Sequence, residues 1–357
     1  MNKTDQMSFF GFEADAAETV PSKETQTAMS QVASTVAVTP LSVYAAVAPS
    51  EAMTSSAPSD LEAMAQNLAQ HPDFRVLRRL VPRTDYGPLS GQATRRVIVL
   101  DTETTGLDSK NEKVIELAML SVLVDLATGL PIGPVTIYES FEDPGRPIPP
   151  QITEITGIDD SMVQGQRIND AAVKALVQEA DLVVAHNAGF DRPFVEARFP
   201  VFADKAWACS FQGIDWKKEG SGSAKLEFLA SERGWFYDAH RAQVDCHALL
   251  QVLASPLTDG QTGLSRLLSG LGQTRYKLRA TGAPFESKDK LKARGYRWDG
   301  EGRVWWCSLA SDDLLDAECD WLREEVYGRR SARVQLEALD SRVQYSSRSG
   351  HVSERTV

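Results

Sequence analysis

A buried strand that ends in two carboxylates is the feature that most constrains this chain. The stretch VIVLDTETTGLD, residues 97–108, opens with four apolar residues and becomes acidic at Asp101 and Glu103. Because these residues are two positions apart, both side chains point to one face of an extended chain. Like charges this close repel unless a cation lies between them, and their hard oxygen atoms suit Mg²⁺ or Mn²⁺. A lone D-x-E motif also fits an acidic surface turn.

Two later segments again place an acid beside a buried element. AHNAGFD puts Asp191 five residues after His186, where the apolar strand DLVVAHN ends. HRAQVD puts His240 five residues before Asp245, which opens a helix. Ligand sites of α/β sheets open at the carboxyl ends of strands, so we expect these acids to meet there. Taken singly, Asp191 fits a turn and Asp245 fits a helix cap.

The order and spacing of these motifs resemble the DEDDh branch of the DnaQ-like 3'-5' exonucleases, which includes replicase proofreading subunits, RNase T and oligoribonuclease. The family's DxETTG motif stands at residues 101–106, HNAxFD at 186–191 and HxxxxD at 240–245. GRPIPPQITEITGI, at 145–158, matches the segment between the first two motifs. The other branch has Tyr four residues before the last Asp, where this chain has Arg241.

The resemblance implies an RNase H-like mixed sheet flanked by helices, with a metal-dependent site. In that reading Asp101, Glu103, Asp191 and Asp245 hold two divalent ions, Mg²⁺ or Mn²⁺, for phosphodiester hydrolysis. His240 is then the general base that takes the proton from the attacking water, since imidazole exchanges protons near neutral pH.

The family also grips the 3'-terminal nucleotide with residues that follow the first Glu. Carried over, the substrate-binding residues are Thr104, Thr105, Gly106, Leu107, Asn187 and Phe190. Core packing is the alternative for Leu107 and Phe190, and His186 is expected to orient its loop. Thr156 stands where replicase-type members often have His, which removes one expected base contact.

Composition and pattern divide the chain into six parts. They are a disordered tail (1–58), a short helical lead-in (59–91), the α/β exonuclease domain (92–256), a linker (257–274), a small basic and aromatic α/β unit (275–328) and a flexible C-terminal tail (329–357). Strands that alternate with helices favour a layered α/β domain. The tail is predicted to be disordered because it is rich in Ala, Ser and Thr and lacks periodicity.

Two outlying segments suggest partners. Within the tail, Gln6, Met7, Ser8, Phe9 and Phe10 resemble the short peptide by which bacterial proteins bind the sliding clamp. An unbound apolar tail is the alternative. In residues 275–328, basic residues interleave with aromatic ones: Phe285, Tyr296, Trp298, Trp305 and Trp306. Such a mixture fits either a groove for single-stranded nucleic acid or the core of a small unit.

The totals narrow the class of protein. A net charge of −11 argues against a protein that merely coats nucleic acid. The four cysteines form no C-x-x-C pair, and we find neither a secretory signal nor a membrane-length apolar run, so a cytoplasmic location is expected. We expect an exonuclease acting on single-stranded or frayed 3' ends of DNA in repair or proofreading. The alternatives are an RNA-trimming exonuclease and a non-catalytic adaptor, although an adaptor would be expected to have lost a motif residue.

Overall fold

The computed structural model describes residues 60–357, which fall into two compact units that divide after Val76. In the first unit, helix α2 (Asp60–Ala69) buries no side chain. It confirms a helix in the predicted lead-in. The predicted disordered tail and its peptide Gln6–Phe10 lie outside the described residues.

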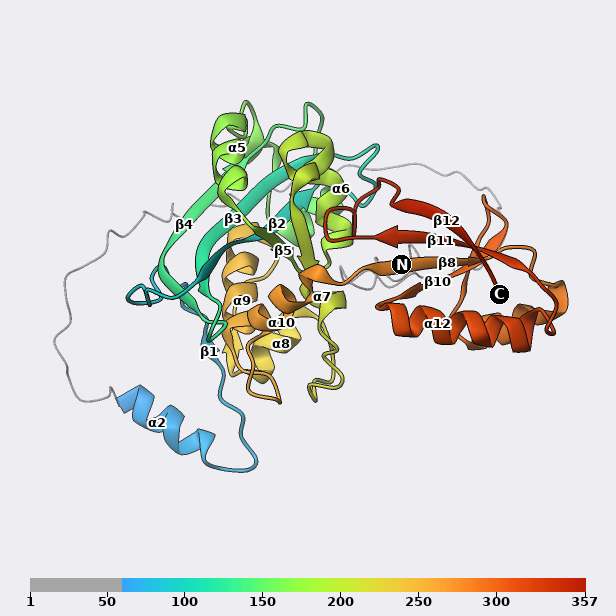
Figure 1. Cartoon of the computed structure of the whole chain (residues 1–357). Coiled ribbons are helices and arrows are strands. Elements are labelled where there is room, and N and C mark those ends of the chain that lie inside the picture. Colours follow the sequence, from blue (N-terminus) through green and yellow to red (C-terminus); the bar gives the residue numbers. More distant parts are fainter. Residues whose placement is uncertain (1–59) are drawn as a thin grey trace, which may run out of the picture. The chain divides into compact units, whose positions relative to one another are not determined.

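The second unit is built on a five-stranded mixed sheet (Figure 1). Its strands, in sheet order, are β4 (Pro131–Phe141), β3 (Val114–Asp125), β2 (Thr94–Thr104), β5 (Leu182–Ala185) and β6 (Ala206–Cys209). β2, β3 and β4 run antiparallel, whereas β5 and β6 run parallel to β2. The central strands are apolar on both faces because helices cover both. The predicted mixed sheet flanked by helices is confirmed.

Helices α8, α9 and α10 pack on one face of this sheet, against Val97 and Val99. Helices α5 and α6 lie on the opposite side (Figure 1), toward which Ile98 and Leu100 point by alternation. The helical bounds are α3 (Pro150–Thr156), α4 (Asp160–Val163), α5 (Asp170–Glu179), α6 (Ala188–Arg198), η1 (Pro200–Asp204), α7 (Ser210–Gly213), α8 (Leu226–Glu232) and α9 (Ala242–Ala254). A short parallel pair, β1 (Arg78–Arg79) and β7 (Trp235–Phe236), ties the lead-in to this domain.

Residues 257–274 are not a linker, as the composition suggested. They contain α10 (Gly263–Ser269) and η2 (Gly270–Gly272). Leu257, Leu264 and Leu267 are buried in the core beneath the central sheet. The Gly, Ser and Thr residues of this segment concealed an apolar stripe at helical spacing, which packs against α9.

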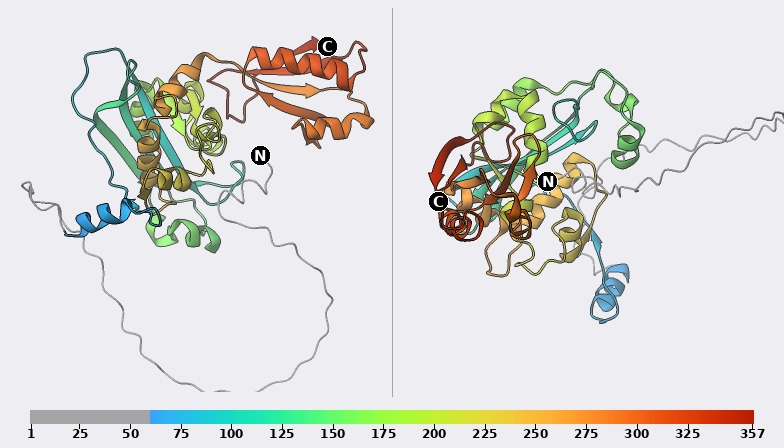
Figure 2. Two further views of the ribbon diagram at one scale, coloured as in Figure 1. Left: turned by 90° about the horizontal axis from the view of Figure 1, so that it is seen from below. Right: turned by 90° about the vertical axis from the view of Figure 1, so that its right-hand side faces the viewer.

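A second five-stranded sheet forms the C-terminal unit, and it is wholly antiparallel. Its order is β12 (His351–Thr356), β11 (Arg333–Leu339), β8 (Arg275–Ala280), β10 (Val304–Leu309) and β9 (Arg297–Asp299). The helical segments η3 (Phe285–Ser287), α11 (Lys288–Ala293), α12 (Asp312–Trp321) and the π-helical turn η4 (Leu322–Val326) complete it. Leu278, Leu291 and Leu322 share the core between sheet and helices, and Figure 2 shows α12 along one face of the sheet.

The predicted flexible tail at 329–357 is wrong. β11 pairs with β8 in the middle of the second sheet, and β12 pairs with β11, so the small unit extends beyond residue 328. Val334 and Leu336 alternate with polar residues, which is the pattern of a half-buried strand. The tail was predicted to be flexible because the loop between the two strands is polar and dominates the composition of this segment.

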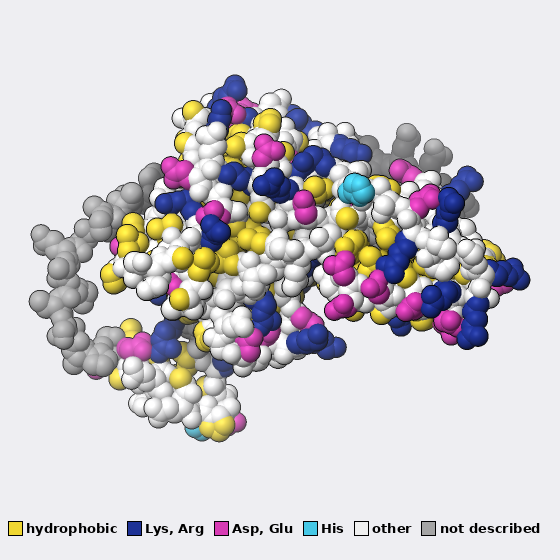
Figure 3. All heavy atoms as spheres, viewed as in Figure 1, with side chains coloured by type: hydrophobic (Ala, Val, Ile, Leu, Met, Phe, Trp, Pro, Cys, Tyr) yellow, Lys and Arg dark blue, Asp and Glu magenta, His cyan; other side chains and the backbone are white. Residues whose placement is uncertain are grey.

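The surface carries both signs of charge. In the view of Figure 3, Lys and Arg side chains are interspersed with Asp and Glu over most of the visible face. Within residues 60–357, the helices are all too short or too polar to traverse a bilayer.

Candidate active site

Three carboxylates meet at the end of β2. Asp101 and Glu103 lie on the same face of this strand, and Asp245 reaches them from the first turn of α9. One oxygen atom from each of the three lies within 4.8 Å of the others. The packing of α9 against β2 and β3 brings position 245 next to position 101. Oxygen donors at this spacing suit a hard divalent cation.

Asp191 is tied to the same strand but does not join that group of three. It lies in the first turn of α6, after Asn187, whose backbone has a left-handed φ of 68°. The backbone N–H and the hydroxyl of Thr102 donate to Asp191 Oδ1 at 3.1 and 2.9 Å. Because Thr102 lies between Asp101 and Glu103, these bonds fix the fourth acid beside the first two.

Burial of these four like charges raises the pKa of each. Burial is the largest cause for Asp101 and Glu103, whose pKa values lie well above the ordinary range, and the neighbouring carboxylates add to it. Burial also raises the pKa of Asp191 and of Asp245 to about 7, although hydrogen bonds from Thr102 and Tyr237 oppose it. Bound cations would stabilise all four as anions, so the donor set fits divalent metal ions.

His240 lies at the edge of this cluster, two residues before α9. Its backbone has a φ of 66°, a left-handed conformation that is uncommon outside glycine. Its imidazole is half-buried and makes no hydrogen bond to any residue of 60–357. Next to it, the Tyr237 hydroxyl donates to Asp245 Oδ1 at 3.1 Å. No motif includes Tyr237, so sequence patterns alone do not point to it.

A fifth carboxylate, Glu116, was missed by the sequence reasoning. It lies on β3 directly opposite Glu103 and is fully buried. Arg241 donates to it from Nη2 at 2.9 Å, and the Ala242 N–H donates at 3.0 Å. This ion pair anchors the turn that carries His240. An acid inside the apolar run VIELAMLSVLVD was the available signal, since a buried charge needs a partner.

The residues predicted to grip a nucleotide follow the carboxylates of β2. The Thr104 hydroxyl donates to the Gly106 carbonyl at 2.6 Å, and the Thr105 hydroxyl donates to Glu112 at 2.5 Å. A Cβ atom at Gly106 would come within 3.0 Å of the Glu112 side chain, so the glycine leaves room for Glu112 to lie against the backbone at this position.

The other predicted contacts are divided between core and surface. Leu107 is half-buried, whereas Asn187 and Phe190 are buried. The Phe190 ring packs on that of Phe194, with 5.1 Å between the ring centroids. A role in nucleotide binding stays a prediction for all six residues.

His186 and Thr156 have local structural contacts. The ring nitrogens of His186 contact the Ser210 hydroxyl at 2.7 Å and the Ala224 carbonyl at 2.9 Å. Burial lowers the pKa of His186 to about 4, so the ring is neutral at physiological pH. The Thr156 hydroxyl donates to the Ile152 carbonyl and accepts the Ile158 N–H. These contacts orient the loops that the two residues belong to.

Arg192, the neighbour of Asp191, connects α6 to the C-terminal unit. Its side chain is fully buried and forms an ion pair with Glu196 at 2.6 Å. Its guanidinium also donates to the backbone carbonyls of Arg342 and Gln344. The sequence between β11 and β12 therefore helps to hold the helix that carries the fourth acid.

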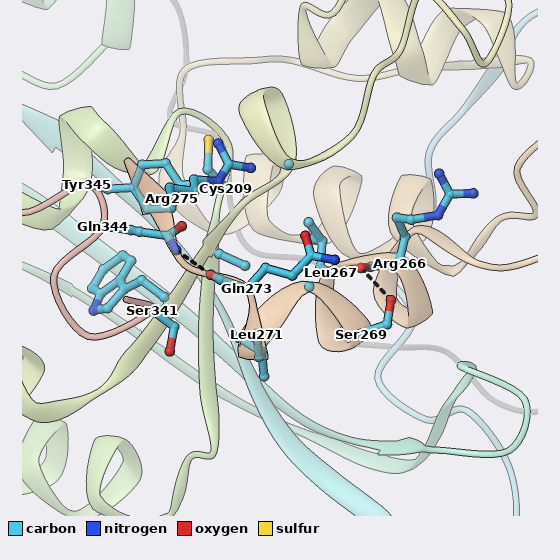
Figure 4. Close-up of a pocket in the computed structure, with 14 residues that line it drawn as sticks. Cys209, Arg266, Leu267, Ser269, Leu271, Gln273, Arg275, Ser341, Gln344 and Tyr345 are labelled. Carbon is cyan, nitrogen blue, oxygen red and sulfur yellow. Dashed lines mark hydrogen bonds between the residues drawn. The ribbon is translucent and has the colours of Figure 1, made fainter. Parts of the chain in front are cut away.

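An open pocket of about 130 Å³ lies where the loop between β11 and β12 meets β6, α10 and η2. Figure 4 shows Tyr345 and Arg275 beside Cys209, with Gln344 turned toward Gln273. The Gln344 side-chain amide donates to the Gln273 carbonyl at 3.3 Å. The backbone N–H of Trp207, on the edge strand β6, donates to the Ser341 carbonyl at 2.8 Å. This pocket shares no residue with the carboxylate cluster.

Comparison with known proteins agrees with this geometry. A profile of the RNase_T exonuclease family matches residues 98–253. The PolC-type DNA polymerase III of Clostridium perfringens is 39% identical over 101 residues, which cover 28% of this chain and 6% of the polymerase. The corresponding protein of Streptococcus pyogenes serotype M1 is 34% identical over 185 residues, or 48% of this chain and 12% of the polymerase. The chain thus spans a small part of these relatives.

Two solved structures are also similar. One is exonuclease X in complex with 5' overhanging duplex DNA, at 23% identity and a TM-score of 0.35, covering 47% of this chain and 99% of that one. The other is the zinc-bound complex of E. coli ExoI with single-stranded DNA, at 16% identity and a TM-score of 0.40, covering 66% and 68%.

The family match and the motif residues define an exonuclease domain over residues 98–253. This part of the chain is similar to the DnaQ-like exonucleases.

Proposed function

We propose that this protein is a metal-dependent 3'-5' exonuclease that releases nucleoside monophosphates from the 3' ends of DNA, in repair or proofreading. One observation carries the proposal: Asp101, Glu103 and Asp245 come from distant segments and place oxygens within 4.8 Å of one another. Asp191 is bonded to the strand between the first two. Glu103 and Asp191 are buried and Asp101 and Asp245 are half-buried, which distinguishes this cluster from an exposed acidic surface.

The four acids would hold the divalent ions, and each has a support that fixes its position. Asp191 accepts two hydrogen bonds from Thr102, and Asp245 accepts from Tyr237 and from the Arg241 N–H. When bound, Mg²⁺ or Mn²⁺ would supply stabilisation of the charge that develops on the phosphate and the leaving oxygen. Two ions are proposed because the family uses two.

His240 is proposed as the general base of the reaction. Its half-buried imidazole, which is not engaged by any other described side chain, can accept the proton of the attacking water. The Arg241–Glu116 ion pair, on the next residue, would keep the imidazole in place during this transfer. Hydrolysis of the terminal phosphodiester then yields a nucleoside monophosphate and a shortened strand.

Polarity and substrate rest on the family, and DNA is preferred because the relatives are DNA polymerases. RNA trimming is the second enzymatic candidate, since the same motifs occur in RNase T and oligoribonuclease. A non-catalytic adaptor is disfavoured because all five motif residues are present and the acids are brought together.

The test uses single-stranded DNA and RNA of one sequence, each labelled at its 5' end. Each is incubated with the full chain, its Asp101→Ala variant and an Asp204→Ala control, in Mg²⁺, Mn²⁺ or EDTA. Asp204 is an exposed acid of the same domain. We expect a ladder that shortens from the 3' end, requires metal, is lost only in Asp101→Ala and forms faster on DNA. A faster RNA ladder would favour RNA trimming, and no ladder on either strand would favour the adaptor.

Sliding-clamp binding through Gln6–Phe10 stays a separate prediction, supported by the sequence of this peptide alone. Deleting residues 1–12 should abolish capture by an immobilised clamp and leave cleavage of a free oligonucleotide unchanged. Unchanged capture would dismiss this peptide as the clamp ligand.

A further inference from the structure

The structure separates the aromatic residues of the C-terminal unit into core and surface. Tyr296 is 3% exposed and belongs to the core under α12. Phe285 and Trp298, in contrast, are 75% and 54% exposed. Leaving two large rings in water forgoes the free energy of their burial, so these two are not needed to build the unit.

These exposed rings line a groove of about 560 Å³ beside the β9–β10 hairpin. Trp298 on β9 is the cross-strand partner of Trp305 on β10, and their ring centroids are 5.5 Å apart. Phe285 and Lys288 also line the groove, and the Lys288 ammonium lies 4.4 Å from the centroid of the Phe285 ring. The lining therefore includes the aromatic rings of Phe285, Trp298 and Trp305.

The charge of this groove has one sign. Its lining residues include the cations Lys288 and Arg303 and no carboxylate. Neither cation forms an ion pair with any residue between 60 and 357. The adjacent Asp299 alternates with Trp298 along β9, and its carboxylate accepts the N–H groups of Glu301 and Gly302 within the hairpin turn. The groove thus keeps two cations available for an anionic ligand.

The other face of this sheet is a weaker candidate. Lys277 lies over the Trp306 ring at 4.5 Å, but Arg279 on the same face is neutralised by Glu337 at 2.7 Å. A buried carboxylate beside the basic row opposes the binding of phosphate. The groove beside the hairpin has no such opposing charge among its lining residues.

We propose that this groove binds unpaired nucleotides of single-stranded DNA, with bases stacked on Trp298 and Phe285 and phosphates held by Lys288 and Arg303. Aromatic rings interleaved with cations are what sequence-tolerant single-strand sites use, because every base has a face that stacks. An apolar peptide would leave both cations without a counter-charge. The choice of DNA rests on the proposed function. In this role the C-terminal unit retains the strand while the exonuclease domain shortens it, which raises the local concentration of 3' ends.

Binding is measured by fluorescence anisotropy with fluorescein-labelled oligo(dT) of about 20 nucleotides, long enough to cross the groove. The full chain carries Asp101→Ala and is kept in EDTA, so cleavage does not interfere. Phe285→Ala with Trp298→Ala is compared with Leu314→Ala, which removes an exposed apolar side chain of α12 outside the groove. We expect the double variant to raise Kd by about fivefold or more for each of the two rings it lacks. The control should leave Kd unchanged.

The charge contribution is tested in the same assay. Lys288→Gln with Arg303→Gln should weaken binding further and reduce its dependence on salt. An unchanged Kd after removal of both rings, or an equal loss in the Leu314→Ala control, would overturn the proposal. Tighter binding of RNA of the same sequence would overturn the assignment to DNA.

Failure of this site is distinguishable from failure of the proposed function. Cleavage of a trinucleotide, which has few bases to offer the groove, should be equal in the wild-type chain and in a chain lacking only the two rings. If the enzyme is active but its affinity for oligo(dT) does not change when the rings are removed, only the proposed groove is refuted. If the protein binds oligo(dT) through the rings but does not cleave it, only the proposed exonuclease activity is refuted.

Discussion

The carboxylate cluster and the aromatic groove differ in the sign and in the solvent exposure of their charged side chains. The cluster holds Asp101, Glu103 and Asp245 against one another at the end of a buried strand, and burial raises their pKa values. The groove leaves Lys288 and Arg303 in water beside exposed rings, without ion pairs among the described residues. In the first region either protons or bound cations would relieve the repulsion between the acids, whereas the second region holds no such repulsion between neighbouring acids.

This difference indicates what each region can do. Acids held rigidly by hydrogen bonds and packing can position ions and a reacting phosphate to the accuracy that chemistry requires. Rings and long cationic side chains at a surface adapt to any base sequence but position nothing so closely. On our proposals, the first region carries out the chemistry and the second retains the strand.

The largest expected effect is on turnover. His240→Asn should lower the cleavage rate by about 10²–10⁴-fold, because the proton acceptor is lost. Asparagine is chosen since it tolerates the left-handed φ of 66° at this position. Cleavage rates and Mn²⁺ titration by calorimetry measure the two roles, with the exposed His351→Asn as the control. Equal loss of metal affinity would show that His240 supports the metal site instead.

The next effect concerns the connection between the two regions. Arg192→Met should lower the free energy of unfolding by about 3–5 kcal/mol, since it removes a buried cation and leaves Glu196 and two carbonyls without their donor. Urea unfolding measures the change, and the exposed Arg330→Met is the control. A loss below about 1 kcal/mol, which is what an exposed ion pair contributes to stability, would mean that the contacts of Arg192 with the C-terminal loop add little to the stability of the fold.

Metal should stabilise the cluster in a pH-dependent way. Asp191 and Asp245 have folded-state pKa values near 7, above their ordinary value of 3.8, so without metal they cost stability as pH rises from about 4 through 7. Metal requires the ionised acids, so Mn²⁺ should raise Tm more at pH 8 than at pH 5. At a hundred times Kd the gain is about 2.7 kcal/mol.

Scanning calorimetry with Mn²⁺ or EDTA at the two pH values measures this gain. A Glu103→Gln variant should lose most of it, because one charged ligand is removed from the cluster. An equal gain at both pH values, or an equal gain in the variant, would place the stabilising metal elsewhere.

The smallest expected effect tests the groove as a surface that the fold does not need. Phe285→Ala should change the free energy of unfolding by less than about 0.5 kcal/mol, since the ring is already exposed. Phe202→Ala, at a fully buried ring beside Trp207, should cost about 3–5 kcal/mol in the same urea assay. A large loss at Phe285 would show that this ring is structural and weaken the contrast between the two regions.

Local pattern was sufficient for much of this protein. The apolar run before Asp101 and the alternation of strands with helices each predicted elements that the structure contains. The motif spacing also identified the acids that meet in space, because a D-x-E on a strand has a defined geometry. Segments whose apolar residues lie among Gly, Ser and Thr, such as α10, or beside a polar loop, such as β11 and β12, were misjudged.

The sequence by itself determined the four acids, His240 and the α/β class, because strand periodicity and motif spacing act over a few residues. Only the tertiary structure decided which partners those residues acquire. Glu116 and Arg241 are 125 positions apart, and Arg192 contacts carbonyls about 150 positions later. It also decided that Trp298 faces solvent while Tyr296 is buried. Burial of a side chain and the partner of a buried charge depend on how distant segments pack, which no local pattern records.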